Sequence, residues 1–142
     1  MSNSKSIGVA YEDQNIIGAD RVEAATIAAT GTIGYAAGSY ATVTQQNNKT
    51  TAVTINTPSG EIITANAQMA PSANAVFVVN CSAVSTKDVV IISVASGGTL
   101  GAYNVFIAAV SNGSFTVEIK NVTNNAYSEA IKLNYAILHT AT

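Results

Sequence analysis

The fold is decided by residues 103–120, which read Tyr-Asn-Val-Phe-Ile-Ala-Ala-Val-Ser-Asn-Gly-Ser-Phe-Thr-Val-Glu-Ile-Lys. The Asn-Gly pair in the middle is a strong hairpin signal, because both residues tolerate the positive φ angles of a tight turn. Beyond it, Phe115, Val117 and Ile119 alternate with polar side chains, which is the period of a strand with one buried face. The stretch therefore predicts a β-hairpin.

The same pattern continues along the rest of the chain. Ile131, Leu133, Tyr135 and Ile137 share one face of a long final strand, so the hairpin extends into a predicted β-meander. We expect an all-β fold, an antiparallel β-sandwich or jelly-roll-like body of about eight strands with an extended N-terminal arm. The expected strands are Tyr40–Gln45, Thr51–Thr57, Glu61–Asn66, Asn74–Cys81, Lys87–Ala95, Tyr103–Val110, Phe115–Lys120 and a final strand through Ile131–Ile137.

Two details of this body follow from local sequence. Pro58-Ser59-Gly60 is predicted to turn the chain into the strand that begins at Glu61. Two stretches are nearly continuous apolar runs, Asn74–Cys81 and Lys87–Ala95. Such runs predict central strands that are covered on both faces, and a neighbouring subunit could cover one of these faces.

Composition excludes several classes of protein. The chain has 142 residues, a single cysteine (Cys81) and a single histidine (His139), which provide neither an internal disulfide nor a metal cluster, and we expect no cofactor. A net charge of −2 gives no basic surface for nucleic acid. The uncharged stretches are broken by Thr, Ser, Asn and Gly throughout, unlike a membrane span.

Charge divides the chain into an arm and a body. Residues 1–30 hold two basic and four acidic side chains, whereas residues 31–142 hold four of each. We therefore expect an N-terminal arm over residues 1–38 and a β-sandwich domain over residues 39–142. Asp20 and Glu23 have the spacing of a capping box before an alanine-rich stretch, so a short helix and an extended segment both remain open there.

The residues that most often carry catalysis have simpler interpretations here. Glu118 and Glu129 lie on strands one hairpin apart, but each is expected to be solvated rather than paired in a cleft. Cys81 follows two valines and one asparagine, which favours a small buried side chain. His139 lies close to the C-terminus without an acidic neighbour in sequence, which indicates a lightly packed terminal residue. We expect no enzymatic activity.

Two features could serve recognition instead. Tyr103 and Tyr127 lie near predicted turns, where tyrosines could form a modest platform for a sugar, although edge or interface residues are the simpler explanation. Gly97-Gly98-Thr99-Leu100-Gly101 lacks the lysine and the following helix of a phosphate-binding loop, so it is predicted to be a β-turn loop.

The body has few of the devices that protect exposed strand edges. Residues 31–142 contain four lysines, no arginine and two prolines, Pro58 and Pro71. Charge and proline normally keep free edges from pairing with other chains. We therefore expect the edges and apolar faces to be covered in a homo-oligomer.

Several stretches resemble small structural proteins of tailed bacteriophages. They are residues 6–14 (Ser-Ile-Gly-Val-Ala-Tyr-Glu-Asp-Gln), residues 31–38 (Gly-Thr-Ile-Gly-Tyr-Ala-Ala-Gly), residues 48–60 and residues 128–138. Such proteins are capsid decoration or cement proteins, or head-fibre proteins, present in many copies as β-rich oligomers. The resemblance implies a virion structural role on the capsid surface after synthesis in the host cytoplasm, with a trimer as the expected assembly.

The expected partner is the major capsid protein or another virion protein, and neither nucleic acid nor membrane. The arm would make this contact, with apolar side chains against the shell and acidic ones against basic shell residues. The candidate contact residues are Ile7, Val9, Tyr11, Glu12, Asp13, Ile16, Ile17 and Asp20. The alternative function is a receptor- or glycan-binding head-fibre or tail-fibre module, which would use the loops Ser96–Ala102 or Thr123–Ala126.

Overall fold

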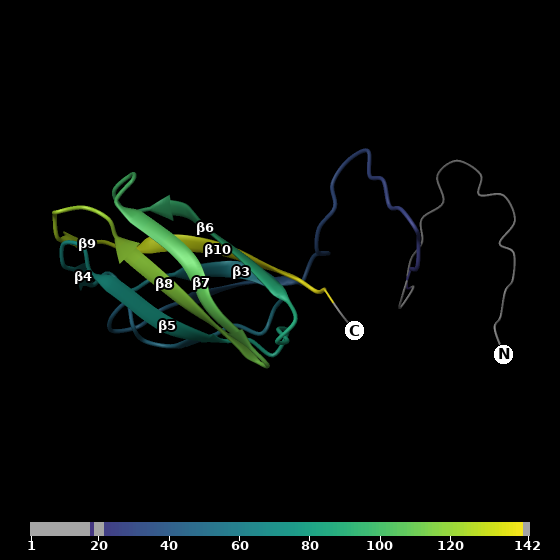
Figure 1. Cartoon of the computed structure of the whole chain (residues 1–142), viewed down its shortest axis with the longest axis horizontal. Coiled ribbons are helices and arrows are strands. Elements are labelled where there is room, and N and C mark those ends of the chain that lie inside the picture. The colour runs from purple at the N-terminus through teal and green to yellow at the C-terminus, as the bar shows by residue number, and fades with distance from the viewer. Residues whose placement is uncertain (1–17, 19–21, 141–142) are drawn as a thin grey trace, which may run out of the picture. The chain divides into compact units, whose positions relative to one another are not determined.

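The computed structural model describes Gly18 and residues 22–140, which contain ten strands and no helix (Figure 1). The chain is therefore all-β, as expected. The strands are β1 (Tyr40–Thr44), β2 (Val53–Thr54), β3 (Ser59–Ile63), β4 (Gln68–Met69), β5 (Asn74–Asn80), β6 (Val89–Gly97), β7 (Tyr103–Ser111), β8 (Ser114–Asn121), β9 (Tyr127–Ser128) and β10 (Ile131–Leu138).

The chain divides into two units, Met1–Ile33 and Gly34–Thr142, and all ten strands belong to the second. In the first unit, residues 22–33 form neither helix nor strand. The helix that the spacing of Asp20 and Glu23 allowed is thus absent over residues 22–33, while Asp20 itself lies outside the described residues. An alanine-rich segment without an apolar face to bury has little to stabilise a short helix.

Two four-stranded sheets form the body. One has the order β1-β3-β10-β6 and the other β2-β5-β8-β7, while β4 and β9 form a small separate ladder. Most pairs are antiparallel, but β1 runs parallel to β3 and β2 runs parallel to β5, which corrects the expectation of a purely antiparallel body. The eight expected strands all form, although the second shortens from Thr51–Thr57 to Val53–Thr54, and β4 and β9 are additional.

One apolar core lies between the two sheets. The inward side chains of β5 and β8, such as Phe77 and Val117, pack in the same cluster as Leu133 and Ile137 of β10. The rings of Phe115 and Tyr135 meet from opposite sheets, with their centroids 5.3 Å apart. Alternating burial on both sheets is the pattern of a β-sandwich.

The predicted hairpin is confirmed, but the predicted meander is wrong. β7 and β8 pair with Ser111 opposite Ser114, and of the two turn residues only Gly113 has a positive φ, of 79°. β10 does not extend this sheet. It pairs with β3 and β6 in the other sheet. The connection between β8 and β10 contains a strand of its own, β9, so it is far longer than a tight hairpin and lets the chain cross.

The two apolar runs expected to form central strands behave differently from each other. β5 lies inside its sheet, whereas β6 is an edge strand of the other sheet. Within the described part of the chain neither is covered on both faces, because Val76 on β5 and Ile91 on β6 expose their side chains. An apolar run alone does not distinguish a strand buried within one chain from one that is left open on its outer face.

The turn predicted at Pro58-Ser59-Gly60 is displaced towards the N-terminus. The chain bends at Thr57 and Pro58, and Gly60 lies inside β3 rather than in a turn. A Cβ atom built on Gly60 would lie 2.6 Å from the carbonyl oxygen of Ala41 and 2.8 Å from Cδ1 of Ile55. Glycine is therefore required here because neighbouring atoms approach the backbone closely, a common reason for glycine inside a strand.

The substitution Gly60→Ala should destabilise the body by about 1–3 kcal/mol, because the added methyl group forces β1 or Ile55 to move. Chemical denaturation followed by circular dichroism measures this change. Gly34→Ala is the matched control, since a Cβ there meets no atom within 4 Å, and its stability should stay close to that of the unaltered chain. Equal stability of both variants would contradict the close approach at Gly60.

Candidate functional site

The eight arm residues expected to contact a capsid or another subunit lie outside the described residues. They are Ile7, Val9, Tyr11, Glu12, Asp13, Ile16, Ile17 and Asp20. In the described part of the chain, two clusters of polar side chains are centred on a carboxylate, one on Asp88 and one on Glu129.

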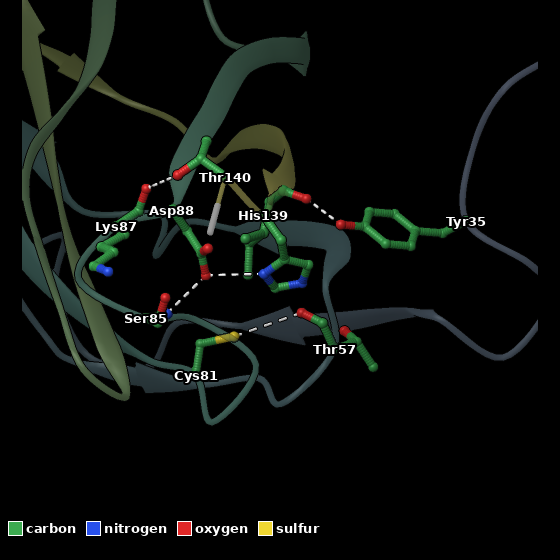
Figure 2. Close-up of polar contacts among 9 residues, drawn as sticks. Tyr35, Thr57, Cys81, Ser85, Lys87, Asp88, His139 and Thr140 are labelled. Carbon is green, nitrogen blue, oxygen red and sulfur yellow. Dashed lines mark hydrogen bonds and ion pairs between the residues drawn. The ribbon is translucent and has the colours of Figure 1, made fainter. Parts of the chain in front are cut away.

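Asp88 forms the centre of the first cluster, directly before β6 (Figure 2). Its Oδ2 atom accepts a hydrogen bond from the backbone N–H of Ser85 at 2.8 Å and lies 2.9 Å from Nδ1 of His139. The carboxylate is buried, and its Oδ1 atom has no hydrogen-bond partner in the described structure. The backbone hydrogen bond from Ser85 has the largest effect on the pKa of Asp88, and together with the bond to His139 it lowers this pKa despite burial.

This cluster ties the segment after β10 to the beginning of β6. The hydroxyl of Thr140 donates to the carbonyl oxygen of Lys87, and the hydroxyl of Tyr35 donates to that of Ile137 (Figure 2). His139, predicted to be only lightly packed, is in fact paired with Asp88 although half of its side chain is exposed. Because 51 residues separate His139 from Asp88, local sequence could not indicate the pair.

An Asp–His pair is also part of many hydrolytic sites, where the imidazole activates a hydroxyl or a thiol. The hydrogen bonds of the described residues place no such group on His139. Cys81 is nearby in Figure 2, but its thiol points to the carbonyl oxygen of Thr57 at 3.5 Å. Burial raises the pKa of Cys81, and its predicted role as a small buried side chain is confirmed.

Glu129 anchors the loop between β6 and β7. Its Oε1 atom accepts hydrogen bonds from the backbone N–H of Thr99 at 2.6 Å and from the hydroxyl of Tyr103 at 2.8 Å, and Oε2 accepts one from the hydroxyl of Thr99. Partial burial acts to raise the pKa of Glu129, but these hydrogen bonds outweigh it and lower the pKa. Glu129 is half-buried and bonded, not solvated as predicted.

A buried ammonium group, that of Lys49, contacts the backbone of Glu129. Nζ of Lys49 donates to the carbonyl oxygens of Ala65 and Glu129, at 2.6 Å each, and to the hydroxyl of Thr64 at 3.3 Å. Burial lowers the pKa of Lys49, and the nearby carboxylate of Glu129 opposes this effect. All three Lys49 protons thus have partners, which makes this residue a structural link between chain segments.

The tyrosines near the predicted turns meet in the same region. The rings of Tyr103 and Tyr127 contact edge to face, with centroids 6.1 Å apart. A hollow of about 470 Å³ adjoins Tyr103 and is otherwise lined by residues 94–101, the end of β6 and the following loop. The N–H of Val122 donates to the carbonyl oxygen of Ala102, so the two loops considered for recognition lie at the same end of the sandwich (Figure 1).

Glu118 and Glu129, the carboxylates weighed as a catalytic pair, have separate partners. Glu118 accepts a hydrogen bond from the side-chain amide of Asn74 at 2.6 Å, on the outer face of the β5–β8 pair. Among the described residues, no group of three or more His, Cys, Asp or Glu side chains is arranged to hold a metal ion.

No helix in the described part of the chain has the length and apolarity needed to cross a membrane. Comparison of the whole chain with protein-family models, with curated protein sequences and with solved structures found no match.

The Asp88 cluster should make stability depend on pH. The pKa of Asp88 is lower in the folded protein than its ordinary value of 3.8, so the carboxylate stabilises the fold above about pH 4, and this contribution is lost as the pH falls through the folded-state pKa. The variant Asp88→Asn should be less stable at neutral pH and lose less stability on acidification than the unaltered chain.

Urea denaturation at several pH values between neutral and about pH 3 measures this difference. Glu61→Gln is the control, because it removes one negative charge from β3, on a different strand from the cluster. If stability fell equally with pH in Asp88→Asn and in the unaltered chain, the Asp88–His139 pair would not contribute to the pH dependence of stability.

Proposed function

We propose that this chain is a non-enzymatic structural protein of a bacteriophage virion, a capsid decoration or cement protein that binds the head shell and stabilises it. The protein would be made in the host cytoplasm and act on the capsid surface as a homo-oligomer, with the major capsid protein or another virion protein as its partner. The resemblance to small phage structural proteins suggests this role and a trimeric state.

The observation that carries this proposal is the charge-free pair of edge strands, β6 and β7. Neither strand contains Asp, Glu, Lys, Arg or Pro, and each ends its sheet without a further partner in the described structure. Free edges of this kind lead to association with other chains. In a subunit that is assembled in many copies, such edges can mediate contacts between the copies, whereas in a monomeric enzyme they would favour aggregation.

The two polar clusters support a structural role as well. Asp88 and Glu129 direct their hydrogen bonds to the backbone and side chains of this chain, and Lys49 does the same. These bonds fix loops and chain ends in place. Reactive groups usually converge on an open cleft, and the described residues place no nucleophile beside His139.

The arm supplies the proposed contact with the shell. Its apolar side chains would pack against the shell, and its acidic side chains would meet basic residues there. The apolar residues are Ile7, Val9, Tyr11, Ile16 and Ile17, and the acidic ones are Glu12, Asp13 and Asp20. Apolar anchors surrounded by charged groups are typical of protein interfaces, in which charge sets specificity more than affinity.

Deletion of residues 2–20 should abolish attachment to the capsid while the body remains folded, because the body keeps its own core. The measurement is co-sedimentation of the purified protein with capsids that lack it, together with circular dichroism of the free protein. The control is Glu61→Gln, which alters the body and not the arm and should still attach.

Cryo-electron microscopy of virions provides the independent test. Density for this chain at many symmetric positions on the capsid would agree with the proposal. Attachment by the chain without residues 2–20, or density at the tail alone, would refute the decoration role.

A second candidate function is a receptor- or glycan-binding module of a head or tail fibre. The observation that favours it is the Tyr103–Tyr127 contact beside a hollow, with the Glu129 carboxylate bonded to Tyr103. Aromatic rings with a polar group at their edge suit the apolar face and hydroxyls of a sugar.

A glycan array distinguishes the two candidates. A decoration protein should give no saturable signal. A saturable signal that is lost in Tyr127→Ala but kept in Tyr40→Ala, which alters an exposed tyrosine on β1, would favour the recognition module.

A further inference from the structure

β6 and β7 lie next to each other along one side of the sandwich, and we call this side, with its two free strand edges, the open side. These strands are the last members of their sheets, β6 after β10 and β7 after β8, and they are neighbours across the sandwich (Figure 1). At nine residues each, they are the longest strands of the described chain. The two longest strands thus each have a free edge.

The core is incompletely covered on this side. Ile92 on β6 and Val105 and Ile107 on β7 pack against the core, yet they stay partly exposed. The corresponding inward residues of the inner strands, such as Leu133 and Val117, are fully buried. A further layer of protein along β6 and β7 would therefore remove additional apolar surface from water.

The outward face of the two edge strands carries large apolar side chains beside the polar Ser93 and Asn104. Ile91 exposes 58% of its surface and Phe106 exposes 43%. Each strand has one residue without a partner in the ladder, Ala95 in β6 and Ala108 in β7. These bulges leave Val89–Val94 and Tyr103–Ile107 as the regular stretches whose outer backbone groups can pair.

We infer that the open side formed by β6 and β7 is the surface through which copies of this chain associate. The inference rests on the proposed function in one respect, the homo-oligomer, and assigns the residues that build it. Main-chain hydrogen bonds between free edges and burial of Ile91, Phe106, Ile92 and Val105 hold the copies together.

The absence of charge on both edges favours a second copy of the chain as the partner. A partner with acidic or basic side chains at this surface would bury charges without a counter-charge, which is costly. A second copy presents edges of the same length and the same neutrality. Either a two-fold axis, which joins β6 to β6 antiparallel, or a three-fold axis, which joins β6 to β7, meets this condition.

The test introduces charge on the edge of the full-length chain. In Ile91→Lys/Phe106→Lys, the lysines repel their counterparts in the neighbouring copy, and both side chains are exposed enough in the single chain for folding to survive. Analytical ultracentrifugation should show loss of the oligomer at a concentration where the unaltered chain is fully associated. Ser93→Lys places a charge on the exposed face of β6 without removing an apolar side chain, and should weaken association in the same direction.

The matched control is Val76→Lys/Val78→Lys, on the inner strand β5, where the exposed fractions are 44% and 40%. This variant adds the same charge in place of similarly exposed valines but leaves the edges unaltered, so it should remain oligomeric. Circular dichroism confirms that each variant is folded.

Three outcomes overturn the inference: a monomeric unaltered chain, an edge variant that stays oligomeric, or dissociation of the β5 variant alone. Attachment of the unaltered chain to capsids, measured separately, decides the proposed function. A chain that attaches as a monomer would therefore refute this interface while leaving the decoration role in place.

Discussion

The contact between β8 and β10 is the interaction on which the rest of the structure depends. Phe115 and Tyr135 meet across the sandwich, and both strands lie inside their sheets with partners on either side. Their inward side chains are almost completely removed from water. Because burial of apolar area is the main favourable contribution to folding, these two strands hold the sheets together, and the other strands are added at their sides.

The ends of the sandwich are held by polar groups rather than by apolar burial. Lys49 joins three chain segments through its ammonium group, and Glu129 fixes the loop after β6. At the other end, Asp88 holds the Ser85 turn and His139. Buried polar groups of this kind stabilise a structure only while they remain bonded, so they specify one arrangement of the loops.

Sequence patterns predicted what depends on local periodicity, such as the hairpin around Asn112-Gly113 and the positions of eight strands. They failed where contacts between distant parts of the chain determine the structure. β10 was predicted to continue the hairpin as a meander, but it pairs with β3 in the other sheet. The candidate site shows the same limit. Glu129 and His139 were expected to be solvated or lightly packed, but their partners, Thr99 and Asp88, are 30 and 51 residues away. The eight arm residues lie outside the described residues, so their role stays a prediction.

The low charge of the body and the edge position of β6 and β7 both bear on one constraint, that long free strand edges tend to pair with other chains. A sandwich of two four-stranded sheets has four edge strands, and here β1 and β2 are short while β6 and β7 are long. Short edges are weak templates for pairing, but long ones need charge, proline or a cover. β6 and β7 have neither charge nor proline, and bulges at Ala95 and Ala108 protect only part of each. Covering of these two edges by a second copy, as we propose, would explain both the lack of charge in the sequence and the length of the edge strands in the fold.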